Sequence, residues 1–285
     1  KLSIMAESKA EYQKILKNYQ ELTGNWQELL NDKDGFSKTF IHLNSGFIFP
    51  LAKKQYEEII NKYPEILENR KNDNGTNKDF MNYYFGIEEG KFVILMIDSI
   101  SDRNGNIEMV FKVTFGESLI TKYRQGIEII FDQIDNLIAD DKRDDYPQEN
   151  RISALRAMDR FLKWSLFGQE WVENYFSVLK DKKNNEGKED YYFPVIRFPF
   201  SGIKELFDKK EKPDTLYHFF GLKKKQNVKK NNIENPIETY DFDLLATANS
   251  DQGFPNTFSN FSCICEADDE IKRSNEFSLL PSQYQ

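Results

Sequence analysis

Residues 80–98 read FMNYYFGIEEGKFVILMID, and this stretch decides the fold. Its first part, residues 80–87, is rich in aromatic side chains, which favour a strand. Glu88, Glu89 and Gly90 then supply a turn, and residues 91–99 form a second strand-like segment. Because residues 92–97 are apolar without alternation, both faces of this second strand are expected to be buried. The stretch therefore predicts an antiparallel hairpin at the centre of a sheet.

Asn104 and Gly105 follow this hairpin and indicate a second turn. The Asn-Gly pair is favoured in type I′ turns because both central positions need φ > 0. The next segment has apolar residues at alternate positions, which predicts a half-exposed returning strand. The sequence thus predicts a meander of antiparallel strands. The alternating apolar residues are Ile107, Met109, Phe111, Val113 and Phe115.

The neighbourhood of the hairpin occurs twice in the chain. Residues 48–51 read Ile-Phe-Pro-Leu and precede the hairpin, which completes a first copy. In a second copy, residues 197–200 read Arg-Phe-Pro-Phe and precede residues 214–222, Asp-Thr-Leu-Tyr-His-Phe-Phe-Gly-Leu. Each proline is expected in the first turn of a helix, where its missing N–H costs nothing. Gly86 and Gly221 are expected to let a strand bend. The pattern predicts a degenerate duplication.

The segments around the two copies complete the predicted architecture. The expected class is α+β, with two related lobes that each place a helix against a small antiparallel sheet. A helical hairpin separates the lobes, and an amphipathic helix precedes them. The expected divisions are the N-terminal helix at 1–35, the first lobe at 36–116, the helical hairpin at 117–182, the second lobe at 190–265 and an irregular tail at 266–285.

Residues 6–31 are expected to form the N-terminal helix. Its apolar side chains alternate spacings of three and four residues, which is the a/d stripe of a heptad repeat. Two interpretations stay open: the stripe packs on the chain's own domain, or it docks a protein partner or a second copy of the chain. The candidate partner-binding residues are therefore those of the stripe, Tyr12, Ile15, Tyr19, Leu22, Trp26 and Leu29.

Composition excludes some partners. The chain has 285 residues and a net charge of −8, which argues against nucleic acid because affinity for phosphate depends on Lys and Arg. The longest apolar run, residues 92–97, is much shorter than the ~20 residues that span a bilayer, so no membrane span is expected. Only two cysteines are present, which indicates a reducing compartment. The expected location is the cytoplasm, and the alternatives are a secreted or an injected protein.

Histidine chemistry is limited to His42 and His218. Any triad that needs a histidine must use one of these two rings. His218 takes the place of Tyr83 in the second copy, and a position that accepts either ring favours packing. His218 is nevertheless the histidine that we keep as a candidate catalytic residue.

Carboxylates and thiols give the other candidates. Asp98 could form an acid/base pair with Asp241 or Asp243 if the lobes face one another across a cleft. Cys263 and Cys265 are the candidate metal ligands, although zinc pairs are normally two to four residues apart. The chain has no glycine-rich phosphate loop and no His-Glu-x-x-His motif. We therefore expect no metal and no cofactor.

The hairpin pattern, from Tyr84-Phe85-Gly86 through Gly90-Lys91 and Asp98 to Asn104-Gly105-Asn106, resembles a group of small uncharacterised bacterial proteins found mainly in Bacteroidota. In that group, a helix precedes a hairpin of this kind, and a Cys-Pro-x-x-Cys motif lies near the end. This chain departs from that motif with Ser262-Cys263-Ile264-Cys265. The resemblance covers residues 45–110 and, more faintly, 195–265. It implies a fold and no activity.

The function that these observations favour is a non-enzymatic protein-interaction or structural component of a bacterial assembly. The heptad stripe and the abundant aromatic residues support it, because aromatic side chains are enriched at interfaces. One alternative is a small-molecule-binding protein or hydrolase that uses Asp98, Asp241 and His218 in a cleft between the lobes. Another is an effector or immunity protein whose acidic surface meets a basic partner.

Overall fold

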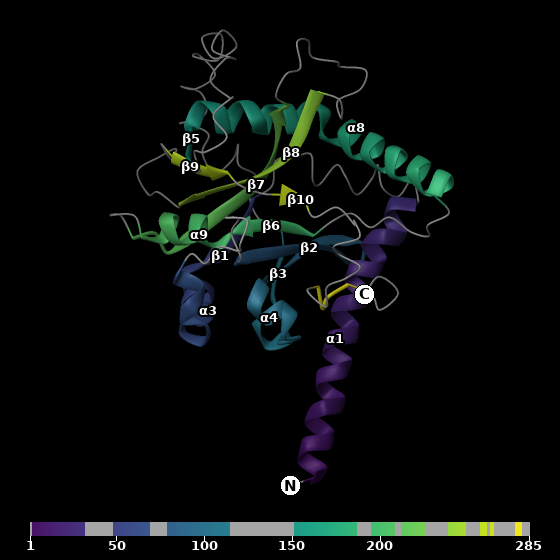
Figure 1. Ribbon diagram of the computed structural model, residues 1–285, viewed down its shortest axis with the longest axis vertical. Helices are drawn as coiled ribbons and strands as arrows, with labels where there is room; N and C mark the ends of the chain where they lie inside the picture. The colour runs from purple at the N-terminus through teal and green to yellow at the C-terminus, as the bar shows by residue number, and fades with distance from the viewer. Residues whose placement is uncertain are drawn as a thin grey trace.

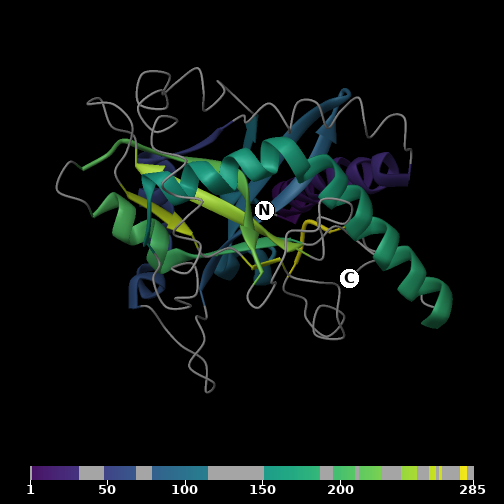
Figure 2. The same cartoon turned by 90° about the horizontal axis from the view of Figure 1, so that it is seen from above.

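Helices and two antiparallel sheets make up the structure, a computed structural model (Figures 1 and 2). The predicted α+β class is confirmed. The structure describes residues 2–31, 48–68, 79–114, 151–186, 195–208, 212–225, 239–248, 257–260, 263–264 and 277–280. His42, Cys265 and the first arm of the predicted helical hairpin, residues 117–139, lie outside this part of the chain.

Sheet I has the strand order β1-β7-β8-β9-β5. Its strands are β1 (Phe49–Ala52), β7 (Thr215–Lys224), β8 (Tyr240–Ala248), β9 (Thr257–Asn260) and β5 (Arg151–Ser153). Sheet II has the order β10-β6-β2-β3-β4. Its strands are β10 (Cys263–Ile264), β6 (Ile196–Pro199), β2 (Phe80–Glu88), β3 (Lys91–Asp98) and β4 (Phe111–Thr114).

The two copies of the sequence pattern exchange their short strands. Strand β1 of the first copy pairs with β7 of the second, and Phe49 lies opposite His218. Strand β6 of the second copy pairs with β2 of the first, and Phe198 lies opposite Met81. Each sheet therefore contains strands from both predicted lobes, and the division into two separate lobes is not confirmed. That the copies arose by duplication stays a prediction.

The prolines of the pattern lie in short strands. Pro50 lies inside β1, and the following helix α3 (Lys53–Lys62) begins three residues later, so the helix-start prediction for Pro50 is wrong. Because β1 is the edge strand of sheet I, a residue without an N–H is tolerated there. Pro199 is the last residue of β6 and directly precedes α9 (Phe200–Phe207), so it lies one residue before the predicted position.

The two predicted turns have different outcomes. Glu89 and Gly90 both have positive φ, 51° and 73°, as a two-residue hairpin between β2 and β3 requires, so the first turn is confirmed. Asn104 has φ −85° and ends the short helix α4 (Ser99–Arg103), so the type I′ prediction is wrong. The Asp98 side chain accepts hydrogen bonds from the first amides of α4, and this cap draws the chain into a helix before it can turn.

The strand after α4 is shorter than predicted. A 3-10 turn, η2 (Ile107–Met109), occupies the first part, and only β4 pairs with β3. Within β4, Phe111 and Val113 are half-buried while Lys112 and Thr114 are exposed, so the predicted alternation is confirmed there. The residues of β3 from Phe92 to Asp98 are buried, as the central position predicted.

Two long helices cover the sheets. Helix α1 (Leu2–Asn31) runs along sheet II, and its N-terminal half projects away from the body (Figure 1). Helix α8 (Ala154–Glu186) is the second arm of the predicted helical hairpin and covers sheet I (Figures 1 and 2). Two shorter helical elements, α3 and η1 (Pro64–Glu68), lie beside β1 in the chain. The layers are thus α8, sheet I, sheet II and then α1 with α4.

Each long helix crosses a sheet at a glycine of the repeated pattern. A Cβ atom on Gly86 would lie 3.1 Å from the Cβ of Leu22 in α1, and one on Gly221 would lie 3.0 Å from the Cβ of Arg160 in α8. The glycines therefore allow close approach of helix and strand. Each crossing brings a tryptophan within 5.1–5.5 Å of two phenylalanine rings, Trp26 with Phe85 and Phe92, and Trp164 with Phe220 and Phe242.

A methyl group at the second crossing should destabilise the fold. We expect Gly221→Ala to lower the free energy of unfolding by about 1–3 kcal/mol through overpacking. The new Cβ would lie 2.7 Å from Leu245 Cδ1, which can move aside, and 3.0 Å from Arg160 Cβ, which is fixed to the α8 backbone. Urea denaturation of Gly221→Ala beside Gly86→Ala tests this expectation. Wild-type stability of Gly221→Ala would contradict the crossing geometry.

Sheet II has buried clusters on both faces. The main core lies between the sheets and contains Tyr83, Phe85 and the tryptophans of the crossings. A second cluster, the outer cluster, lies on the opposite face beneath α1. Tyr12, Leu16, Tyr19 and Leu22 of α1 pack against it. The outer cluster consists of Tyr84, Leu95, Ile97, Ile107, Val110, Val195, Phe277, Leu279 and Leu280.

Candidate functional site

The residues that correspond in the two copies, Tyr83 and His218, meet at the centre of the main core. Tyr83 Oη and His218 Nε2 are 3.0 Å apart, and Phe49 stacks on the imidazole with ring centroids 5.2 Å apart. Both side chains are fully buried. Burial lowers the pKa of His218 to about 3 and raises the pKa of Tyr83 well above its usual value. The pair is neutral and sealed from water, and its contacts are those of a packed core. That His218 has a packing role stays a prediction.

Strand register shows where the acidic candidates lie in the two hairpins. Asp98 lies opposite Met81 at the end of β3, and the matching position in β8 is Ala248, opposite Leu216. Asp243 instead lies opposite Gly221, so its counterpart in the first copy is a residue in the middle of β3. Asp98 and Asp243 therefore occupy different places in their hairpins.

Each acidic candidate has its own local partner. Asp98 Oδ1 accepts hydrogen bonds from the backbone amides of Ile100 and Ser101. Asp241 is exposed, with Lys225 Nζ 3.6 Å away, and Asp243 is buried with Arg160 Nη1 at 2.6 Å. His218 belongs to the main core. The structure thus does not bring Asp98, Asp241 and His218 together at one site.

The metal candidates also lack a site in the part of the chain that is described. Cys263 lies in β10 opposite Arg197, while Cys265 is outside the described residues. Among the described residues, no group of three or more His, Cys, Asp or Glu could hold a metal ion.

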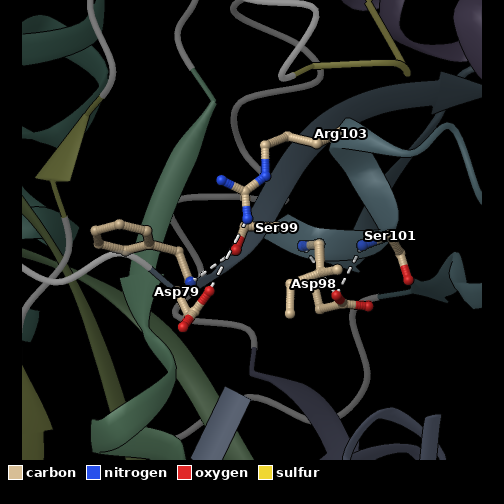
Figure 3. A network of polar contacts seen from close by, with 7 residues as sticks. Asp79, Asp98, Ser99, Ser101 and Arg103 are labelled. Carbon is tan, nitrogen blue, oxygen red and sulfur yellow. Dashed lines mark hydrogen bonds and ion pairs between the residues drawn. The ribbon is translucent and has the colours of Figure 1, made fainter. Parts of the chain in front are cut away.

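A polar network fixes α4 against the start of β2 (Figure 3). Asp98 caps the helix, and the Ser99 hydroxyl accepts a hydrogen bond from the Phe80 amide at 3.1 Å. The Arg103 guanidinium lies 4.0 Å from the buried carboxylate of Asp79. Burial raises the pKa of Asp98, and its hydrogen bonds to Ser101 and to the helix amides oppose that rise. The network holds α4 in one orientation and thereby places Asp102 inside the fold.

Asp102 is a fully buried carboxylate with four donors. Oδ1 accepts from the backbone N and the hydroxyl of Ser278, both at 2.8 Å. Oδ2 accepts from Asn82 Nδ2 at 2.7 Å and from the Tyr84 hydroxyl. Burial raises the pKa of Asp102 to about 6, although these hydrogen bonds lower it. Asp102 therefore anchors the C-terminal residues 277–280 to α4 and β2.

An open groove lies between α1 and the segment after α4. Its volume is about 610 Å³. Tyr12, Ile15 and Tyr19 line it from α1, and Ile107 and Val110 line it from the other side. The rim carries charges of both signs, from Lys9, Glu11 and Glu108.

The groove divides the predicted stripe of α1 into two parts. Trp26 is buried in the main core, and Leu22 and Leu29 pack against buried clusters. Ile15 is 38% exposed and faces the groove. The C-terminal part of the stripe thus packs on the chain's own domain. In the N-terminal part, Tyr12 and Tyr19 are half-buried against the outer cluster, and Ile15 stays exposed.

Sequence reasoning found one side of this surface. The heptad spacing identified Tyr12, Ile15 and Tyr19, but Ile107 and Val110 were missed because that segment was expected to be part of a strand. Asp102 was missed as well. Its partner Ser278 is 176 residues away, so no local pattern signals the contact.

No protein-family model, curated protein or solved structure matches the chain. The resemblance to the Bacteroidota group therefore stays a prediction. Among the described residues, no helix has both the length and the apolar character that crossing a membrane requires.

Proposed function

We propose that the protein is a non-enzymatic interaction component that docks an apolar segment of a partner protein in the groove beside α1. The observation that carries this proposal is the exposed Ile15, which faces the groove beside the half-buried Tyr12 and Tyr19 on a helix that projects from the body (Figure 1). The other residues of α1's stripe are buried or pack against a buried cluster, so the exposed Ile15 is the part most available to a partner.

The chemistry of the lining fits a peptide segment. Two tyrosines supply large, amphipathic contact area, which is typical of the centre of protein interfaces. Covering apolar surface contributes a favourable term of roughly 25 cal/mol per Å², which the ordering of the partner partly offsets. Lys9 lies on the same rim as Glu11 and Glu108, so charges of both signs can fix the orientation of a bound segment. This mixture favours a protein ligand over a uniformly charged polymer.

The buried titratable groups also favour binding over catalysis. His218 pairs with Tyr83, Asp243 pairs with Arg160, and Asp102 accepts from four donors. These contacts serve packing and anchoring, and they give no support to the hydrolase alternative.

A charge in the groove should abolish docking. We expect Ile15→Asp to weaken partner binding at least ten-fold, because the carboxylate must be desolvated when an apolar segment covers it. Leu166→Asp is the matched control, since Leu166 is 73% exposed on α8, far from α1 in the chain. A partner is first identified by photo-crosslinking from position 15, and its affinity for the purified variants is then measured by calorimetry.

The control decides the outcome. Equal affinity of wild type and Ile15→Asp, or an equal loss for Leu166→Asp, would contradict the groove as the docking surface. Sedimentation velocity of the same variants shows whether the partner is a second copy of the chain, in which case Ile15→Asp converts a dimer to a monomer.

A further inference from the structure

Residues 277–280, Phe-Ser-Leu-Leu, are seated in a built site on the outer face of sheet II. Phe277, Leu279 and Leu280 are at most 4% exposed. The Phe277 ring meets Tyr84 edge-on at 6.3 Å, and the Arg197 guanidinium lies 5.6 Å from the centre of the same ring. The four residues form a turn, in which the Leu280 amide donates to the Phe277 carbonyl.

Side chains of the body bind the main chain of this turn. The Ser278 amide donates to Asp102 Oδ1 at 2.8 Å, and the Ser278 carbonyl accepts from Gln20 Nε2 at 3.1 Å. The Leu279 carbonyl accepts from Thr23 Oγ1 at 2.8 Å. Because these three bonds go to backbone groups, any peptide of suitable shape can make them. Selectivity then comes from the buried side chains and from the Ser278 hydroxyl, which also donates to Asp102.

The site is separable from the main core and continuous with the groove. Phe277, Leu279 and Leu280 belong to the outer cluster, while the contacts that join the two sheets belong to the main core. Ile107 and Val110 are members of the outer cluster and also line the groove beside α1. If residues 277–280 left the site, the groove would therefore become longer. The added pocket would carry the hydrogen-bonding groups of Asp102, Gln20 and Thr23.

We propose that this pocket is a peptide-binding site, that residues 277–280 are its resident ligand, and that an aromatic–Ser–Leu–Leu turn of a partner binds there in their place. The inference rests on the proposed function, since it names the kind of segment that the groove and pocket together accept. The resident turn then regulates docking, because a tethered ligand competes at high effective concentration.

A peptide in trans tests the proposal on the full chain. The probe is a fluorescein-labelled synthetic peptide with the sequence of residues 275–282, Asn-Glu-Phe-Ser-Leu-Leu-Pro-Ser. Phe277→Ala/Leu279→Ala weakens the resident turn, and we expect it to bind the probe at least ten-fold more tightly than wild type in fluorescence anisotropy. Adding Asp102→Ala should reverse this gain at least ten-fold. A probe with Asp in place of the first Leu should not bind.

Two results would overturn the proposal. One is a folded Phe277→Ala/Leu279→Ala variant, judged by circular dichroism, that binds the probe no better than wild type. The other result comes from hydrogen exchange of the wild-type protein. This measurement keeps the proposal testable if the double variant does not fold. The Ser278 amide should exchange at least ten-fold faster than the protected amides of β3. Equal rates would show that the turn leaves only when the whole fold opens.

The outcome is independent of the test of the proposed function. Ile15→Asp changes the groove and leaves the residues that bind the turn intact. Probe binding together with unchanged partner affinity in Ile15→Asp would keep the peptide site and remove the groove as docking surface. If Ile15→Asp loses partner affinity but no variant binds the probe, the groove stays the docking surface and the peptide site is removed.

Discussion

Replacing Asp243 by valine is expected to lower the free energy of unfolding by about 3–5 kcal/mol, because it removes the carboxylate from a buried guanidinium. Asp243 and Arg160 side chains are 6% and 3% exposed, and Nη1 lies 2.6 Å from Oδ2. Arg160→Leu should lower the free energy of unfolding by a similar amount, because the Asp243 carboxylate would then be buried without the guanidinium.

The double variant should be more stable than either single variant. At the crossing of α1 over Gly86, the apolar pair Leu22 and Val93 takes the equivalent positions, and each lies 3.1 Å from the position of a Cβ on Gly86. Arg160→Leu/Asp243→Val recreates that pair against Gly221. Buried ion pairs can often be exchanged for apolar pairs with little loss of stability.

Urea denaturation of the four proteins measures the coupling between the two positions. The exposed pair Lys204 and Asp208, 2.8 Å apart in α9 and its C-cap, provides the control, because an exposed pair contributes only about 0–1 kcal/mol. If the losses in the double variant equal the sum of the single losses, the two crossings are not interchangeable, and the correspondence between Leu22 and Arg160 fails.

Local signals predicted the elements of the fold but not their pairing. The aromatic and apolar run of residues 80–98 specifies a hairpin by itself, and the structure contains it with the expected turn. The short strands β1 and β6 each span four residues and carry the same Phe-Pro sequence. Nothing in such a short strand selects between two similar hairpins. Their exchange depends on long-range packing around Tyr83 and His218, which a sequence pattern does not contain.

The Asn-Gly prediction failed because a competing local interaction was stronger. A carboxylate at position 98 can cap a helix, and the amides of Ile100 and Ser101 lie within reach of it. Once α4 forms, Gly105 takes a positive φ of 63° after the helix, and Asn104 no longer has to. The same residues thus support two local structures, and the cap at Asp98 decides between them.

The candidate site could be predicted only in part, because the position of α1 on the sheet depends on long-range packing. Heptad spacing identifies the apolar face of α1, and Tyr12, Ile15 and Tyr19 are on it. Which part of that face stays accessible depends on where α1 crosses the sheet, and Gly86 fixes the crossing beside Leu22. Ile15, the exposed residue of the stripe, lies N-terminal to the crossing, and its exposure follows from the packing of α1 on β2.

Asp102 should make stability depend on pH with a sign opposite to that of most carboxylates. Its pKa in the folded protein is raised from 3.8 to about 6, chiefly by burial. The stabilisation that the neutral carboxyl contributes is therefore fully present below about pH 4 and is lost as the pH rises through about 6. A shift of this size corresponds to a difference on the order of 3 kcal/mol between the two ends of that range.

The comparison with Asp102→Asn isolates this contribution, because the amide does not titrate. The stability of wild type minus that of Asp102→Asn should fall by on the order of 3 kcal/mol from pH 4 to pH 7, measured by urea denaturation. Asp98, whose pKa is also raised, is present in both proteins, so its contribution cancels. Leu166→Ala, at an exposed position, should follow the pH dependence of wild type. If the difference rises with pH instead, the four donors outweigh burial, and the ionised carboxylate holds residues 277–280 more firmly than the neutral acid does.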